Sequence, residues 1–119
     1  MRVVIISHNI RLCVAQINST VGDIKGNSQK ILEAALKAKN QGSTLILTPE
    51  LSLSGYPPED LLLRDDFNAQ CHQELLALAT LIKDITLIVG HPHVHHGDCY
   101  NAASVLQNGR VLCLSLIHI

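Results

Sequence analysis

The sequence predicts an α/β fold in which helices cover a sheet, with the elements in the order β-α-β-α-β-β-β. Short aliphatic runs suited to buried strands alternate with longer segments whose apolar residues recur at helical spacing. Hydrophobic residues make up 47% of the 119 residues, which is ample for a packed core. An Asn-Gly pair at 108–109 lies between two apolar runs, and this pair is the strongest short signal of a β-hairpin.

The first half of the chain predicts a strand, a helix and a second strand. Residues 11–17 (RLCVAQI) suit a buried strand and end in a cluster of turn-forming residues. Asn27 is expected to cap a helix over residues 28–41, in which apolar side chains repeat at helical spacing. Residues 43–50 (STLILTPE) show no polar alternation, which predicts a strand covered by other layers on both faces.

The second half predicts a helical region and three strands. Two prolines at 57–58 exclude a helix before them, and a helical region in one or two pieces follows over residues 61–84. Residues 85–90 (ITLIVG) predict a third buried strand, and residues 91–98 (HPHVHHGD) predict a polar surface loop. Residues 99–116 predict two strands joined at the Asn-Gly pair.

Composition argues against several classes of protein. The formal net charge is -1, and no cluster of Lys and Arg is long enough to follow a phosphate backbone, so we expect no nucleic-acid partner. No apolar run approaches twenty residues and no signal-peptide pattern is present, so we expect no membrane span. The four cysteines are widely spaced without a C-x-x-C, which predicts reduced thiols in a cytoplasmic protein: Cys13, Cys71, Cys99 and Cys113.

Glu50 is the first candidate functional residue. It ends a strongly apolar run, and a glycine and two prolines follow it within eight residues. A carboxylate at the carboxyl end of a buried strand lies where open α/β sheets place their ligand crevices, and partial burial there would suit a general base. From the residues alone, an ordinary exposed acid in a loop remains the alternative.

The histidine-rich segment 91–98 is a candidate metal site, because imidazole is a common metal ligand and alternating histidines of a strand share one face. The candidate ligands are His91, His93, His95 and His96, with Asp98 or Cys99. A surface turn between two strands is the simpler interpretation, and we expect no metal there.

The stretch LILTPELSLSGYPPEDLL (45–62) resembles the first sequence motif of the carbon-nitrogen hydrolase (nitrilase) superfamily. In this motif a strand leads into the residues P-E-L, and a G-Y turn follows. Within it, AQINSTVGD, the Asn after Gly26 and GYPPEDLL together resemble the glutamine amidase domain of glutamine-dependent NAD synthetases. The resemblance continues through ITLIVGHP and YNAASVLQNGRVL, and covers about residues 12–112. The YPPEDLL extension favours this group over nitrilases and simple amidases.

The resemblance implies part of an α-β-β-α sandwich over residues 11–112, preceded by an extension at 1–10 and followed by a tail at 113–119 that departs from the family pattern. It also implies a Glu-Lys-Cys site, in which Glu50 is the general base and proton acceptor. The place of the family's lysine falls at about Ile117, and the place of its nucleophilic cysteine lies beyond residue 119. None of the four cysteines takes that role.

The implied reaction is hydrolysis of glutamine to glutamate and ammonia, which a synthetase part uses for ATP-dependent amidation of deamido-NAD. The amidase part needs no cofactor, whereas ATP and Mg belong to the synthetase part. Tyr56 is expected to line the glutamine pocket or the ammonia route. Members of the family are usually homo-oligomeric.

Two further expectations concern the chain as written. We expect it to be an N-terminal fragment, ended by a truncated or misassembled reading frame, that does not catalyse the reaction alone. The alternatives are an amidase or nitrile hydrolase of the same superfamily without a synthetase domain, and a non-catalytic module that pairs with the complete enzyme.

Overall fold

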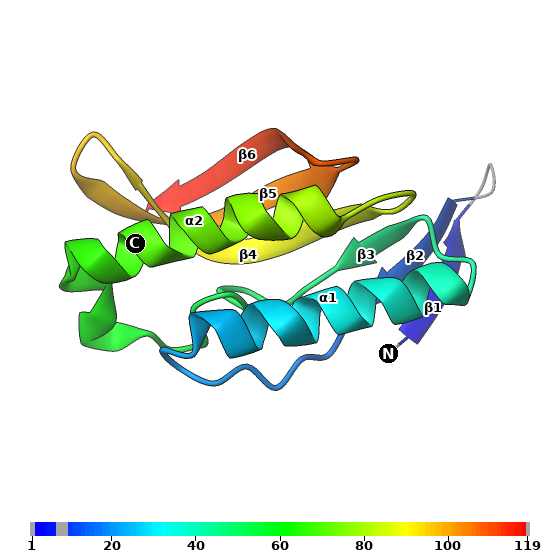
Figure 1. The fold of residues 1–119 in the computed structure, drawn as a ribbon, viewed down its shortest axis with the longest axis horizontal. Coiled ribbons are helices and arrows are strands. Elements are labelled where there is room, and N and C mark those ends of the chain that lie inside the picture. The colour runs from blue at the N-terminus through cyan, green and yellow to red at the C-terminus, as the bar shows by residue number, and fades with distance from the viewer. Residues whose placement is uncertain (1, 7–9, 119) are drawn as a thin grey trace.

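The computed structural model describes residues 2–6 and 10–118, which form one mixed sheet with two long helices on one of its faces (Figure 1). The strands are β1 (Arg2–Ile6), β2 (Ile10–Val14), β3 (Leu45–Leu47), β4 (Thr86–His95), β5 (Asp98–Gln107) and β6 (Arg110–His118). The helices are α1 (Ile24–Asn40), α2 (Asp65–Leu81) and the short 3-10 helix η1 (Glu59–Leu63). The strands lie in sequence order; β2, β3 and β4 are parallel, and the other neighbours are antiparallel.

The hydrophobic core lies between the helices and one face of the sheet. Cys13, Ile46, Leu87 and Leu106 are paired in register across β2, β3, β4 and β5, and each has 0% of its surface exposed. The helices close this layer with residues spaced three and four apart, which places them on one stripe of each helix. These residues are Ile24, Ile31, Ala35 and Ala38 of α1, and Phe67, Cys71, Leu75 and Leu78 of α2.

The opposite face of the sheet carries a second apolar row that no helix covers. Val14, Leu47, Ile88, Val105 and Cys113 are paired in register across five strands, and Val14 and Leu47 are exposed. Both long helices lie on the other face (Figure 1). The sequence predicted that the strand over residues 43–50 is covered on both faces, and this prediction was wrong for this chain. The strand itself is limited to β3.

The predicted order of elements is confirmed, with β1 as an added strand. Residues 2–6, which the sequence assigned to an extension, pair antiparallel with β2. The tail from residue 113 continues β6, which pairs with β5 as far as His118. Whether either segment is foreign to the family stays a prediction.

Two local predictions were wrong. At the start of α1, the N-cap is Asp23, whose Oδ1 accepts a hydrogen bond from the Gly26 amide at 3.1 Å. Asn27, the predicted cap, lies inside α1 and is buried.

The segment 91–98 is not a loop, because β4 runs through His95 and only His96 and Gly97 turn the chain. Ten residues of β4 pair with ten of β5, and this ladder outweighs the polar composition of the segment.

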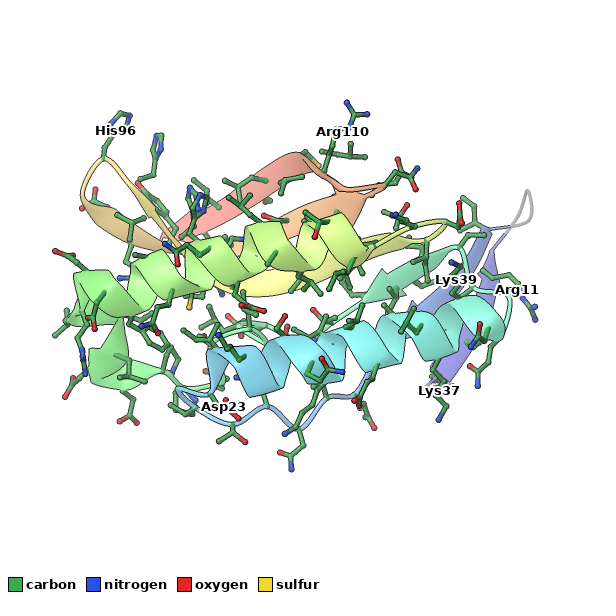
Figure 2. All side chains as sticks on the ribbon, viewed as in Figure 1. Arg11, Asp23, Lys37, Lys39, His96 and Arg110 are labelled. Atoms are coloured by element: carbon green, nitrogen blue, oxygen red, sulfur yellow. The ribbon has the colours of Figure 1, made fainter. Side chains whose placement is uncertain are left out.

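None of the helices in residues 2–6 and 10–118 has both the length and the apolar character that a membrane crossing requires. Figure 2 shows charged side chains such as Asp23, Lys37 and Arg110 projecting away from the sheet and helices.

Candidate active site

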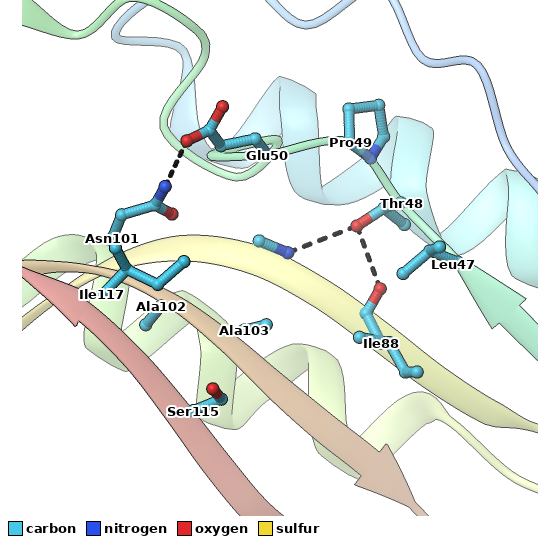
Figure 3. Close-up of a pocket in the computed structure, with 11 residues that line it drawn as sticks. Leu47, Thr48, Pro49, Glu50, Ile88, Asn101, Ala102, Ala103, Ser115 and Ile117 are labelled. Carbon is cyan, nitrogen blue, oxygen red and sulfur yellow. Dashed lines mark hydrogen bonds between the residues drawn. The ribbon is translucent and has the colours of Figure 1, made fainter.

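Glu50 lies in a turn three residues beyond the end of β3, at the carboxyl end of the parallel strands. Its Oε1 accepts a hydrogen bond from Nδ2 of Asn101 on β5 (Figure 3). The carboxylate is exposed, so the expected partial burial was wrong for this chain.

The Glu50 turn forms one wall of a cavity of about 270 Å³, and β4, β5 and β6 form the other wall (Figure 3). Its lining is mostly apolar, with the carboxylate and the Asn101 amide at one end. The lining residues are Leu47, Thr48, Pro49, Glu50, Ile88, Gly90, Asn101, Ala102, Ala103, Ser115 and Ile117. An apolar pocket with a few converging polar groups is typical of a small-molecule site.

Hydrogen bonds to β4 hold the beginning of the turn. Thr48 Oγ1 donates to the Ile88 carbonyl at 3.1 Å and accepts from the Gly90 amide at 3.3 Å (Figure 3). Ser52 Oγ lies 2.9 Å from Thr48 Oγ1, and the Leu53 amide donates to the Gly90 carbonyl at 3.0 Å. Thr48, Ser52 and Gly90 are buried, so these bonds fix the backbone on both sides of Glu50.

The turn can approach β4 this closely only because residue 90 is glycine. A Cβ at Gly90 would lie 2.5 Å from the Pro49 carbonyl oxygen and 2.6 Å from the Leu51 nitrogen, both backbone atoms. Real Cβ atoms essentially never come within 3.0 Å of such neighbours. The glycine that ends the ITLIVG run therefore determines where Glu50 can lie.

The segment after Glu50 is anchored to the first turn of α1 and to the loop that precedes this helix. Nδ2 of the buried Asn27 donates to the Leu53 carbonyl at 3.1 Å, and Ser19 Oγ donates to the Ser52 carbonyl at 2.7 Å. Gly55 has φ +82°, and a Cβ there would lie 2.5 Å from the Val21 Cα. Backbone contacts on both sides thus position the acid, although its own side chain is exposed.

Position 117, where the family lysine is expected, lines the same cavity as Glu50. Ile117 pairs with Asn101 in the register of β5 and β6, and the β-bulge between Val105 and Leu106 falls within this ladder. The structure therefore brings the predicted acid and the predicted lysine position together, with an apolar side chain at the second position.

The cysteines do not belong to this cavity, and three of them are poor nucleophiles. Burial raises the pKa of Cys71 to about 12, and it also raises the pKa of Cys13 and of Cys99. A catalytic thiol requires the opposite shift, because the thiolate is the nucleophile. Cys113 is exposed on the uncovered face of the sheet.

Tyr56 does not lie beside Glu50 in this structure. Its side chain is 64% exposed, and it is not part of the cavity lining. A role in the glutamine pocket or the ammonia route stays a prediction.

Within the described residues, the histidines of β4 do not form a metal-binding cluster with Asp98 or Cys99, the candidate ligands that the sequence offered. His91 is buried, with Nε2 2.7 Å from Ser104 Oγ and Nδ1 3.0 Å from the Pro92 carbonyl oxygen. Its pKa is lowered to about 4, mainly because burial disfavours the charged form. Within the described part of the chain, no three His, Cys, Asp or Glu side chains are grouped to hold a metal ion.

Comparison with known proteins gives one family match. The family described as carbon-nitrogen hydrolase matches residues 11–117, a range that includes most of β6. The chain is 40% identical over 112 residues to the glutamine-dependent NAD(+) synthetase of Xanthomonas campestris, covering 93% of this chain and 20% of the relative. It is 43% identical over 105 residues to the corresponding protein of Aquifex aeolicus, covering 87% of this chain and 18% of the relative.

Solved structures agree with this match. The crystal structure of a glutamine-dependent NAD(+) synthetase from Cytophaga hutchinsonii superposes with a TM-score of 0.87 at 33% identity, covering 92% of this chain and 19% of that one. An amidase from Nesterenkonia superposes with a TM-score of 0.76 at 25% identity, covering 91% of this chain and 44% of that one. The chain therefore has the mixed α/β fold of these proteins, and it spans about a fifth of the length of the synthetases that it matches.

Proposed function

Since the chain belongs to the carbon-nitrogen hydrolase family, we propose that it carries the general base of the glutaminase part of a glutamine-dependent NAD synthetase. The observation that supports this most directly is the Glu50 carboxylate at the end of a small-molecule cavity, in a turn fixed by backbone contacts on both sides. The matched NAD synthetases are 40% and 43% identical to this chain, against 25% for the Nesterenkonia amidase. This difference favours glutamine over the substrate of a simple amidase.

In the proposed reaction Glu50 accepts two protons in turn. It first takes the proton of a cysteine thiol, whose sulfur attacks the side-chain amide carbon of glutamine, and it passes that proton to the departing nitrogen, so that ammonia leaves and a thioester forms. It then takes a proton from the water that attacks the thioester and returns this proton to the sulfur as glutamate is released. A lysine stabilises the negative charge of the tetrahedral intermediates. The Asn101 amide restrains the carboxylate by donating to Oε1.

The chain supplies only part of this site. Ile117 occupies the expected lysine position, and none of the four cysteines lines the cavity. We therefore propose that catalysis needs a lysine and a cysteine that this chain does not carry, and that the chain alone does not hydrolyse glutamine.

The synthetase reaction also uses ATP and Mg²⁺, and the described residues do not fit these groups. The Glu50 cavity contains a single carboxylate and no cationic side chain, and no three His, Cys, Asp or Glu side chains are grouped to hold a metal ion within residues 2–6 and 10–118. We place ATP and Mg²⁺ in the synthetase part. We also propose homo-oligomeric assembly and a cytoplasmic location for the complete enzyme.

A hybrid enzyme tests the role of Glu50. In this hybrid, residues 11–112 of this chain replace the matching segment of the Xanthomonas campestris synthetase. The remainder of the hybrid is the Xanthomonas campestris protein. With Glu50→Gln, we expect NAD formation from glutamine to fall at least about 100-fold, because a general base contributes 10²–10⁴ in rate. NAD formation from added ammonia should be unchanged, since this route bypasses glutamine hydrolysis.

The matched control is Glu33→Gln, which changes an exposed acid on α1 in the same way. It should leave both activities at the level of the unmodified hybrid. A Glu50→Gln hybrid that still makes NAD from glutamine at the control rate would refute the assignment. So would an unmodified hybrid that uses ammonia but not glutamine.

A further inference from the structure

A second, smaller cavity lies between α2 and the end of β4, away from Glu50. It has a volume of about 150 Å³ and is lined by Asn68, His72, Pro92, His93 and Val94. Asn68 and His72 are one helical turn apart, so their side chains share one face of α2. Strand β4 contributes His93 from the opposite wall, and the cavity therefore joins two imidazoles and one amide from two elements.

The two imidazoles face each other across this cavity. The ring centroids of His72 and His93 lie 6.3 Å apart, with the ring planes at 58°. Zn–N bonds of about 2.0–2.1 Å place two ligand nitrogens roughly 3.4 Å apart in tetrahedral geometry. Because His72 is exposed and His93 is only half-buried, small side-chain rotations can bring the two ring nitrogens to that separation.

The amide of Asn68 has an unused acceptor. Its Nδ2 donates to the Leu62 carbonyl at 2.9 Å, which fixes the orientation of the amide. Its Oδ1 is buried and has no hydrogen-bond partner, although a buried acceptor without a partner is costly. A bound cation would satisfy this oxygen.

His91 is excluded as a ligand, although its ring centroid lies 6.1 Å from that of His93. Both of its ring nitrogens are already within hydrogen-bond distance of a protein oxygen, one of Ser104 and one of Pro92. The remaining polar side chain of the cavity lining is Asn68 of α2.

We propose that His72, His93 and Asn68 Oδ1 bind a divalent transition-metal ion of the class that prefers imidazole, such as Zn²⁺, with water as the fourth ligand. This set differs from the segment 91–98 with Asp98 or Cys99 that the sequence suggested. It lies on the helix-covered face of the sheet, so it does not depend on the glutaminase function. The bound ion would join α2 to β4.

The test is a calorimetric titration of Zn²⁺ into the metal-free 119-residue chain, with a competing chelator to measure the affinity. Thermal unfolding is then measured with and without Zn²⁺. All variants carry Cys113→Ser, which removes an exposed thiol that could also bind Zn²⁺. We expect one ion per chain and a higher unfolding temperature with Zn²⁺, because the ion binds only the folded site. His72→Ala and His93→Gln should each weaken binding at least about tenfold.

Two further variants sharpen the result. Asn68→Asp should tighten binding, since a carboxylate replaces an amide oxygen at the same place, and Asn68→Ala should weaken it. His96→Ala is the matched control, because His96 is exposed in the turn outside the cavity, and it should bind Zn²⁺ as the parent does.

His72→Ala changes an exposed helical position to a strong helix former, so loss of binding there cannot be ascribed to unfolding. The proposal is overturned if the parent chain does not bind Zn²⁺ at 1:1, or if binding is the same in the His72→Ala and His93→Gln variants as in the parent.

Discussion

Among single residues, His91 links the stability of the fold to pH. Its imidazole is 1% exposed, and both ring nitrogens are satisfied by neutral oxygens of Ser104 and Pro92. Burial holds the pKa of His91 at about 4, so the side chain is neutral in the folded protein near pH 7. In the unfolded chain the pKa returns to about 6.5 and the imidazole takes up a proton at a higher pH.

We therefore predict that the free energy of unfolding falls as the pH is lowered from about 6.5 to about 4, because the unfolded state binds the extra proton in this window. The His91 contribution amounts to at most about 3 kcal/mol, and it is fully present above pH 6.5. Urea unfolding at pH 7.5, 6, 5 and 4.5 measures it.

The control for this prediction is His91→Gln, which keeps a side chain able to reach Ser104 but does not titrate. Its free energy of unfolding should depend less steeply on pH in the same window. His93 contributes in the same direction, since burial and His72 lower its pKa, so part of the slope should remain. An identical slope in the parent and in His91→Gln would contradict the assignment.

Among elements, α1 is attached to the segment that follows Glu50 by a residue inside the helix rather than by its cap. Asn27 Oδ1 accepts from the Thr20 amide at 2.7 Å, and Nδ2 donates to the Thr20 carbonyl at 2.8 Å and to the Leu53 carbonyl at 3.1 Å. Asp23 makes one capping bond at the exposed helix start. The buried amide thus joins three segments of the chain, whereas the cap serves α1 alone.

Asn27→Ala should lower the free energy of unfolding by about 2–4 kcal/mol, because three hydrogen bonds are lost and buried backbone groups are left unpaired. Asp23→Ala, the matched control, should cost about 1 kcal/mol, which is typical of a lost N-cap. Chemical denaturation measures both. Equal losses in the two variants would show that Asn27 acts only locally.

For the whole molecule, the uncovered face of the sheet dominates behaviour in solution. The apolar row from Val14 to Cys113 crosses five strands, and Val4 on β1 and Ile117 on β6 add exposed apolar side chains to the same face. Contiguous apolar surface of this kind favours association. The edges β1 and β6 add unpaired backbone groups that can template strand pairing.

We predict concentration-dependent self-association of the 119-residue chain, measured by sedimentation velocity. The double variant Val14→Thr, Leu47→Thr should weaken it at least about tenfold, because burying each apolar side chain contributes about 1.5–3 kcal/mol. Threonine is β-branched and suits a strand, so the fold should persist. Leu63→Thr, at an 83% exposed position of η1, should change nothing, and a parent chain that stays monomeric would contradict the prediction.

Local sequence patterns were sufficient to predict most of the helices and strands. Aliphatic runs predicted β2, β3 and the first half of β4, helical spacing predicted both long helices, and Asn108-Gly109 predicted the β5–β6 hairpin. They failed at residues 91–95, where polar histidines continue β4, because pairing with β5 overrides composition. They also failed at the start of α1, where Asn27 is buried and Asp23 caps the helix.

By itself, the sequence determined the family and pointed to Glu50 as the candidate acid, because both are carried by short contiguous motifs such as TPEL and GYPPEDLL. Only the tertiary structure decided the partners of that acid. Asn101 lies 51 residues from Glu50, and Ile117 reaches the same cavity through a bulged ladder whose register no local pattern fixes. The physical reason is that a cavity is formed by contacts between distant segments, and these depend on how the layers pack.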